Sequence, residues 1–130
     1  MKQKGGINLK IDFEDERPIF LQIAEQIEDG ILSGAFSEET QIPSTTEISV
    51  NYKINPATAL KGINLLVDDG IVYKKRGLGM FVNTGAVKTI RGKRKEEFFE
   101  NYITKLAGEA RKLGLTQEEI VTMIERGFKQ

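Results

Sequence analysis

The chain has 130 residues, of which 39% are hydrophobic and 29% charged, a balance that suits one ordinary domain or a small domain with an appendage. It contains no cysteine and no histidine, which excludes a disulfide framework, a thiolate metal site and a histidine general base. No apolar run approaches the roughly 18 residues that span a bilayer, and residues 1–10 lack the apolar core of a signal peptide, so we expect a cytoplasmic protein with no membrane partner.

The formal net charge is zero, but the charges are unevenly distributed. No acidic residue occurs between Asp69 and Glu96, and this stretch carries a block of lysines and arginines. Acidic residues gather instead near the N-terminus, where Asp12, Glu14 and Asp15 indicate a solvated acidic face, with a metal site as the alternative. The neutral average therefore hides a basic block that could face nucleic acid. We predict no metal and no cofactor.

The first elements are predicted from apolar spacing. Residues 1–17 form an N-terminal extension, in which Ile7–Phe13 alternates apolar and polar side chains and suggests a short extended segment. A first helix is expected over Pro18–Ser33. Proline suits its first turn, and Gly34 is a plausible stop. Its apolar stripe consists of Phe20, Ile23, Ile27 and Ile31.

Two shorter helices and a hairpin are expected next. The run Ser44-Thr45-Thr46-Glu47 is a capping box that opens a helix over Thr45–Asn51. Asn55-Pro56 is a second helix start, and this helix ends at Asp68-Asp69-Gly70. Ile71–Lys75 and Met80–Val82 are predicted strands joined by a basic, glycine-containing turn.

The remaining chain is predicted to be a linker and two helices. Residues 84–93 are small and basic with no strong period, which is typical of a linker. A long amphipathic helix follows over Arg94–Leu113 and ends at Gly114. A second capping box, Thr116 to Glu119, opens a last helix.

The order helix, short helix, turn, helix, basic hairpin indicates a winged helix-turn-helix that binds double-stranded DNA. Such a domain presents the N-terminal turn of its second helix to the major groove, where small polar side chains reach bases or phosphates. The hairpin is the wing, and its glycines permit a close backbone approach. The predicted DNA-binding residues are Ser44, Thr45, Thr46, Asn55, Ala57, Thr58, Lys61, Lys75, Arg76, Gly77 and Gly79.

The segment Pro18–Val82 resembles the DNA-binding domain of the GntR family of bacterial regulators. The resemblance rests on five stretches in family order and spacing. They are Pro18–Ala24, Ile42-Pro43-Ser44, Asn55-Pro56-Ala57-Thr58, Asp69–Tyr73 and Arg76–Val82. It implies regulation of transcription by a dimer on a palindromic operator.

The chain departs from the family pattern at four places. Thr46 and Leu60 stand where the family often has arginines, and Met80 replaces the usual threonine after the wing glycine. The glycine turn before the first wing strand is replaced around Glu38-Glu39. An arginine that reads a base contributes about 1–3 kcal/mol. We therefore expect either an operator unlike the common family pattern or weak non-specific affinity.

The C-terminal segment is expected to make the protein a homodimer. Most relatives of this kind carry a large effector domain after the wing, but two helices cannot easily enclose a metabolite pocket, so no effector is assigned. The predicted dimerisation residues are Phe98, Phe99, Tyr102, Ile103 and Leu106. Packing of these residues on the winged domain of the same chain is the alternative. The size resembles the short-tailed subfamily named after YtrA, whose members often control transporter operons.

The sequence thus predicts a mostly α-helical protein with a small β wing, of the α+β class. Its expected parts are an extension (1–17), a winged helix-turn-helix domain (18–83), a linker (84–93) and a two-helix dimerisation segment (94–130). We expect a transcription regulator, most simply a repressor. The alternative is a winged-helix module for protein–protein contact, which would favour an acidic or apolar recognition helix. An enzyme is not expected, because histidine and cysteine are absent and no carboxylates converge.

Overall fold

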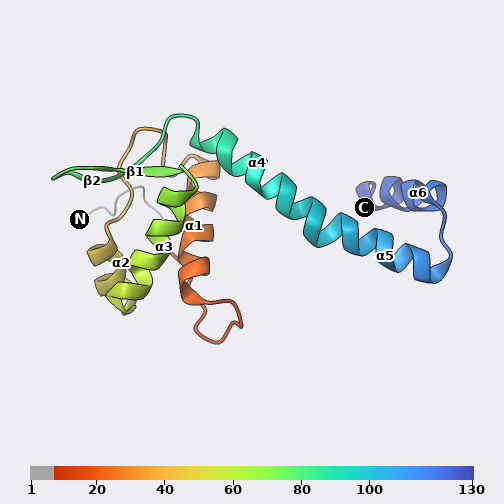
Figure 1. Ribbon diagram of the computed structural model, residues 1–130, viewed down its shortest axis with the longest axis horizontal. Helices are drawn as coiled ribbons and strands as arrows, with labels where there is room; N and C mark the ends of the chain where they lie inside the picture. Colours follow the sequence, from red (N-terminus) through yellow and green to blue (C-terminus); the bar gives the residue numbers. More distant parts are fainter. Residues whose placement is uncertain (1–7) are drawn as a thin grey trace. The chain divides into compact units, whose positions relative to one another are not determined.

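The computed structural model describes residues 8–130, so the expectations for residues 1–7 lie outside the described residues. The chain divides into two units after Arg91. The first holds α1 (Ile19–Ser33), α2 (Thr45–Tyr52), α3 (Pro56–Asp68), β1 (Val72–Lys75) and β2 (Gly79–Val82), as Figure 1 shows. The second holds η2 (Phe99–Ile103), α5 (Thr104–Leu113) and α6 (Gln117–Phe128), while α4 (Ala86–Phe98) contains the division. A mostly helical fold with one two-stranded antiparallel sheet is confirmed.

The helix boundaries follow from the capping residues. The Ser44 hydroxyl accepts a hydrogen bond from the Glu47 amide at 3.0 Å, and the Ser44 amide donates to the Glu47 carboxylate at 3.1 Å, so the predicted capping box starts α2. The Asn55 side chain accepts from the Ala57 amide at 2.8 Å and starts α3. Gly34 ends α1 in the left-handed conformation. Among residues 8–130, no helix is both long and apolar enough to cross a membrane.

The core of the first unit forms where α1 crosses α3. The buried stripe of α1 contains Ile23, Ile27 and Ile31, and α3 contributes Ala59, Ile63 and Leu66. At the crossing, a Cβ atom on Gly62 would lie 2.9 Å from the carbonyl oxygen of Phe20 and 3.1 Å from the Cβ of Ile23. The two backbones therefore approach more closely than any side chain at position 62 allows.

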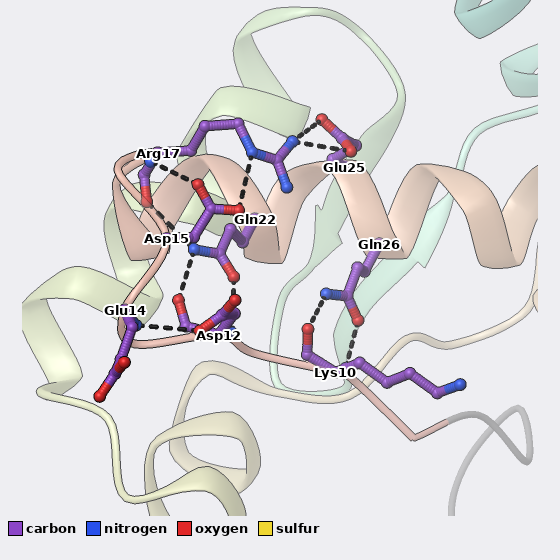
Figure 2. Close-up of polar contacts among 8 residues, drawn as sticks. All are labelled: Lys10, Asp12, Glu14, Asp15, Arg17, Gln22, Glu25 and Gln26. Carbon is purple, nitrogen blue, oxygen red and sulfur yellow. Dashed lines mark hydrogen bonds and ion pairs between the residues drawn. The ribbon is translucent and has the colours of Figure 1, made fainter.

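The segment before α1 is held by two glutamine side chains (Figure 2). Gln22 is buried, donates to the carbonyl oxygens of Asp12 and Arg17 at 2.9 and 3.0 Å, and accepts from the Asp12 amide at 2.8 Å. Gln26 bonds both the amide and the carbonyl of Lys10. Leu9 is buried in the core, and its amide donates to the Tyr52 hydroxyl at 3.0 Å. This segment therefore lies against α1 without joining a sheet.

Two acidic residues of this segment, Asp12 and Asp15, accept hydrogen bonds from nearby amides, and Asp15 also pairs with Arg17 (Figure 2). The Asp12 carboxylate accepts from the Glu14 amide, and the Asp15 carboxylate accepts from the Arg17 amide. The Arg17 guanidinium lies 2.8 Å from the Glu25 carboxylate and 3.5 Å from that of Asp15. In the described part of the chain, no cluster of three acidic side chains could hold a metal ion.

The prediction of a linker at 84–93 was wrong, because the chain is helical from Ala86 onward. Ala86 and Ile90, one turn apart, are buried in the core of the first unit. The first amides of α4 are satisfied from outside the helix, since the Glu38 carboxylate accepts from the amides of Gly85 and Val87 at 3.0 and 3.3 Å. The predicted helix at 94–113 is likewise the continuation of α4 through η2 and α5.

Glu39, beside this cap, ties β1 to the residues before α4. Its carboxylate accepts from the Thr84 hydroxyl at 2.6 Å, the Thr84 amide at 3.1 Å and the Tyr73 hydroxyl at 2.6 Å. Its φ of 67° lies in the left-handed region, where the family pattern has a glycine turn. The hydrogen bonds from Thr84 and then Tyr73 hold the pKa of the Glu39 carboxyl below its ordinary value.

The first prediction concerns the α1–α3 crossing. Gly62→Ala should lower the free energy of unfolding, because overpacking costs about 1–3 kcal/mol and the gain in helix propensity returns at most about 1 kcal/mol. Gly92→Ala is the matched control, since its Cβ would meet nothing within 4 Å in α4, and it should be neutral or stabilising. Urea denaturation of the two variants measures both effects. A Gly62→Ala variant as stable as the wild type would contradict the close crossing.

The second prediction concerns Glu39. A carboxyl whose pKa is lowered by folding stabilises the protein above its unfolded pKa, and this contribution is lost as the pH falls through the folded pKa. The wild type should therefore lose stability below about pH 4.5, the ordinary pKa of this group. Glu39→Gln should lose less over the same range. Denaturation midpoints measured from pH 6 downward to about pH 3 give the slopes.

The matched variant for Glu39 removes its donors instead. Tyr73→Phe combined with Thr84→Val leaves the carboxyl in place but takes away its two hydroxyl partners. This double variant should flatten the same part of the acid slope. An acid slope that is identical in the wild type, in Glu39→Gln and in the double variant would show that these hydrogen bonds do not stabilise the ionised carboxylate.

Candidate nucleic-acid interface

The N-terminal turn of α3 lies at the surface of the first unit. Asn55, Pro56 and Ala57 are exposed and Thr58 is half-buried, while Ala59 directs its side chain into the core. Lys61 is exposed, with its ammonium 4.1 Å from the centroid of the Phe20 ring on α1. The predicted residues of this helix therefore lie in its first two turns, at the accessible N-terminal end that a recognition helix requires.

The start of α2 presents a second exposed helix N-terminus. Thr46 is exposed, and Ser44 and Thr45 are half-buried. The Ser44 oxygen is used as an acceptor in the capping box, but a hydroxyl keeps its own proton to donate. A phosphate oxygen is the kind of acceptor that a helix N-terminus and a free hydroxyl favour together.

The wing is a tight hairpin whose two glycines differ in their surroundings. In the β1–β2 register, Lys75 pairs with Gly79. Gly77 has φ of 78° and open space around its missing side chain. A Cβ on Gly79 would lie 2.5 Å from Nε2 of Gln41, which donates to the Leu78 carbonyl at 2.7 Å. Gly79 thus accommodates a contact within the wing, and Gly77 is the glycine that leaves room for another molecule.

The basic side chains of the wing also differ. Lys74 and Arg76 are exposed. Lys75 is half-buried, and its ammonium lies 4.4 Å from the centroid of the Phe81 ring. A cation over the face of an aromatic ring is attracted to it electrostatically. The wing therefore offers two solvated cations near its tip and a third that is partly held by Phe81.

The predicted dimerisation residues lie on α4, η2 and α5. Phe98, Phe99 and Tyr102 are 56%, 57% and 63% exposed, and Ile103 and Leu106 are half-buried. The Phe98 and Tyr102 rings contact each other, with centroids 5.2 Å apart. Among residues 92–130, all of which the structure describes, Ala110 is the single buried side chain. This unit therefore has almost no core of its own.

Sequence reasoning did not identify several residues that shape this interface. Gln41 supports the wing turn, and Glu38 and Glu39 fix the chain between the wing and α4. Asn64 is exposed on α3, one turn beyond Leu60. A lone glutamine or glutamate in a predicted loop carries no periodic signal, so only the three-dimensional contacts reveal the roles of Gln41, Glu38 and Glu39.

Comparison with known proteins identifies the first unit. Residues 20–82 match the family described as "Bacterial regulatory proteins, gntR family". The HTH-type transcriptional regulator YhcF of Bacillus subtilis is 30% identical over 115 residues, which cover 87% of this chain and 92% of YhcF. The HTH-type transcriptional repressor YtrA of the same organism is 29% identical over 82 residues, 63% of each chain.

The fold is also found in solved structures. A crystal structure of a GntR-family transcriptional regulator from Bacteroides thetaiotaomicron superposes with a TM-score of 0.75 at 35% sequence identity, covering 85% of this chain and 96% of that one. The winged helix with a C-terminal helical segment is therefore shared over nearly the whole of both chains. The chain belongs to the GntR family of bacterial transcription regulators, a family of DNA-binding proteins.

Proposed function

We propose that this protein is a repressor that binds a palindromic operator as a homodimer, through α3 and the wing. One observation carries the proposal. The first turn of α3, the exposed Thr46 at the start of α2 and the basic wing tip all belong to one folded unit. Repression is supported by the likeness to the repressor YtrA. Partnership with DNA would place the protein in the cytoplasm.

The proposed DNA contacts divide by chemistry. Ser44, Thr45 and Thr46 at the start of α2 would bind phosphate, as would Lys75, Arg76 and Gly77 of the wing and the exposed Lys74 beside them. Gly79, whose missing side chain leaves room for Gln41, would shape the wing turn instead. Asn55, Ala57, Thr58 and Lys61 would lie in or beside the major groove. Phosphate contacts release counterions, so affinity should fall steeply with salt. No acidic residue of the sequence lies between Asp69 and Glu96, so the wing itself carries no acidic side chain that would repel phosphate.

The homodimer is proposed from the exposed aromatic side chains of the second unit. Apolar side chains as exposed as Phe98, Phe99 and Tyr102 are characteristic of a surface that another chain covers. A dimer closed by two-fold symmetry would present two recognition helices to a palindrome, about one DNA turn (roughly 34–36 Å) or a multiple of it apart. We also propose that the regulated genes form a transporter operon, because the chain resembles YtrA-type regulators, which often control such operons.

The third prediction tests sequence-specific binding. The purified chain should enrich one palindromic sequence from a random DNA pool, and fluorescence anisotropy should show tighter binding to that duplex than to a scrambled duplex. If Lys74 and Arg76 each bind one phosphate, Lys74→Ala and Arg76→Ala should each reduce the slope of log K against log salt by about 0.9. Failure to enrich any sequence, or equal binding to both duplexes, would contradict the proposal and favour the protein-contact module.

The same assay tests the homodimer. Two chains should bind each selected duplex. A variant with Phe98→Ser and Tyr102→Ser should sediment as a monomer and bind more weakly. Phe13→Ser is the matched control, because Phe13 is 62% exposed but lies in the segment before α1. Sedimentation of the double variant as a dimer would show that these aromatic side chains do not form the interface.

A further inference from the structure

The exposed face of α3 consists of one stripe. Ala57, Leu60, Lys61 and Asn64 are all exposed and follow the spacing of three, four and seven residues that places side chains on one side of a helix. The opposite side is buried through Ala59, Gly62, Ile63 and Leu66. A recognition helix reads the major groove with side chains at this same spacing.

This stripe has an unusual composition for a surface that reads DNA. Leu60, in the centre of the stripe, is 48% exposed, and Ala57 lies one turn before it. The only cation of the stripe is Lys61, whose ammonium lies over the Phe20 ring of α1. The stripe contains no arginine that could bond the N7 and O6 acceptors of a guanine. The centre of the stripe therefore offers methyl groups rather than hydrogen-bond donors.

The major groove contains one apolar group that matches such a surface, the 5-methyl group of thymine. A leucine facing any other base edge would cover donors or acceptors without replacing their hydrogen bonds to water, which is unfavourable. The sole acidic residue of α3 is Asp68 at its C-terminal end, so no carboxylate of this helix lies beside Leu60.

We propose that Leu60 is a specificity-determining residue, which selects a thymine in each half of the operator by contact with its 5-methyl group. This inference rests on the proposed DNA-binding function and deepens it. It also explains why Leu60 stands where the family often has an arginine. A leucine at this position would replace recognition of guanine by recognition of thymine. Asn64, next on the stripe, has the amide that suits a neighbouring adenine.

The experiment uses a series of duplexes, each of which has uracil in place of thymine at one position in each half-site of the selected duplex. Uracil lacks only the methyl group and keeps every hydrogen-bonding atom. Binding to these duplexes is measured by anisotropy for the wild type, Leu60→Ala and Leu60→Met. At one position the wild type should lose about fourfold in affinity per half-site, the value expected for one buried methyl group. Leu60→Ala should lose this sensitivity and Leu60→Met should keep it.

The control variant is Leu21→Ala, which truncates a leucine of similar exposure (41%) on α1. It should retain the full response to uracil. Equal responses of the wild type and Leu60→Ala at every position would overturn the role of Leu60, while tight binding to the selected duplex would leave the proposed function standing. Absence of any selected duplex would overturn both.

A change of preference gives a second readout. In a selection from the random pool, Leu60→Arg should enrich guanine at the position where the wild type enriches thymine, because arginine bonds the N7 and O6 atoms of guanine. Retention of thymine at that position by Leu60→Arg would contradict the assignment. Circular dichroism and urea denaturation check that each variant is folded.

Discussion

The close crossing of α1 and α3 is the constraint on which the recognition surface depends. With no side chain at Gly62, the backbone of α3 lies directly against Phe20 and Ile23 of α1. This contact brings Ala59, Ile63 and Leu66 into the core and leaves the stripe of Leu60 and its neighbours on the surface. A wider crossing would rotate or shift the recognition helix relative to the wing.

The elements around this crossing are fixed by polar contacts as well as by the core, to which Leu9, Ala86 and Ile90 also belong. Gln22 and Gln26 hold the segment before α1, and the buried position of Gln22 is possible because both ends of its amide are hydrogen-bonded. Gln41 supports the wing turn. Glu38 and Glu39, which precede α2, accept hydrogen bonds from Thr84, Gly85 and Val87 and so hold the chain between the wing and α4. The first unit therefore consists of one hydrophobic core, with side-chain hydrogen bonds that hold the peripheral segments at its edges.

Much of the first unit could be predicted because its signals are local. Three helix boundaries depend on residues only a few positions away: the capping box at Ser44, the Asn55-Pro56 start and the stop at Gly34. The structure confirms all three boundaries. The linker prediction was wrong because α4 begins with a cap from Glu38, far away in sequence, and buries only Ala86 and Ile90 in its first turns. Neither feature produces a strong helical period.

The candidate site could be proposed from the sequence in outline but not in detail. The order of elements and the family resemblance predict which turns face DNA, and the structure places Asn55 and Ala57 of one such turn at the surface. The sequence does not show that Lys61 lies over Phe20, or that a side chain at Gly79 would collide with Gln41. These contacts join residues that are distant along the chain, and they decide which side chains remain available to a ligand.

The most direct test of the central claim is the change in backbone amide NMR shifts when the selected duplex is added. The account predicts that the largest changes occur at the starts of α2 and α3 and at the wing tip. These are residues 44–46, 55–61 and 74–79. Amides of α5 and α6 should change little, because these helices are assigned to the contact between chains. Changes confined to residues 98–128, or none at saturating DNA, would contradict the assignment of the winged helix as the DNA-binding surface.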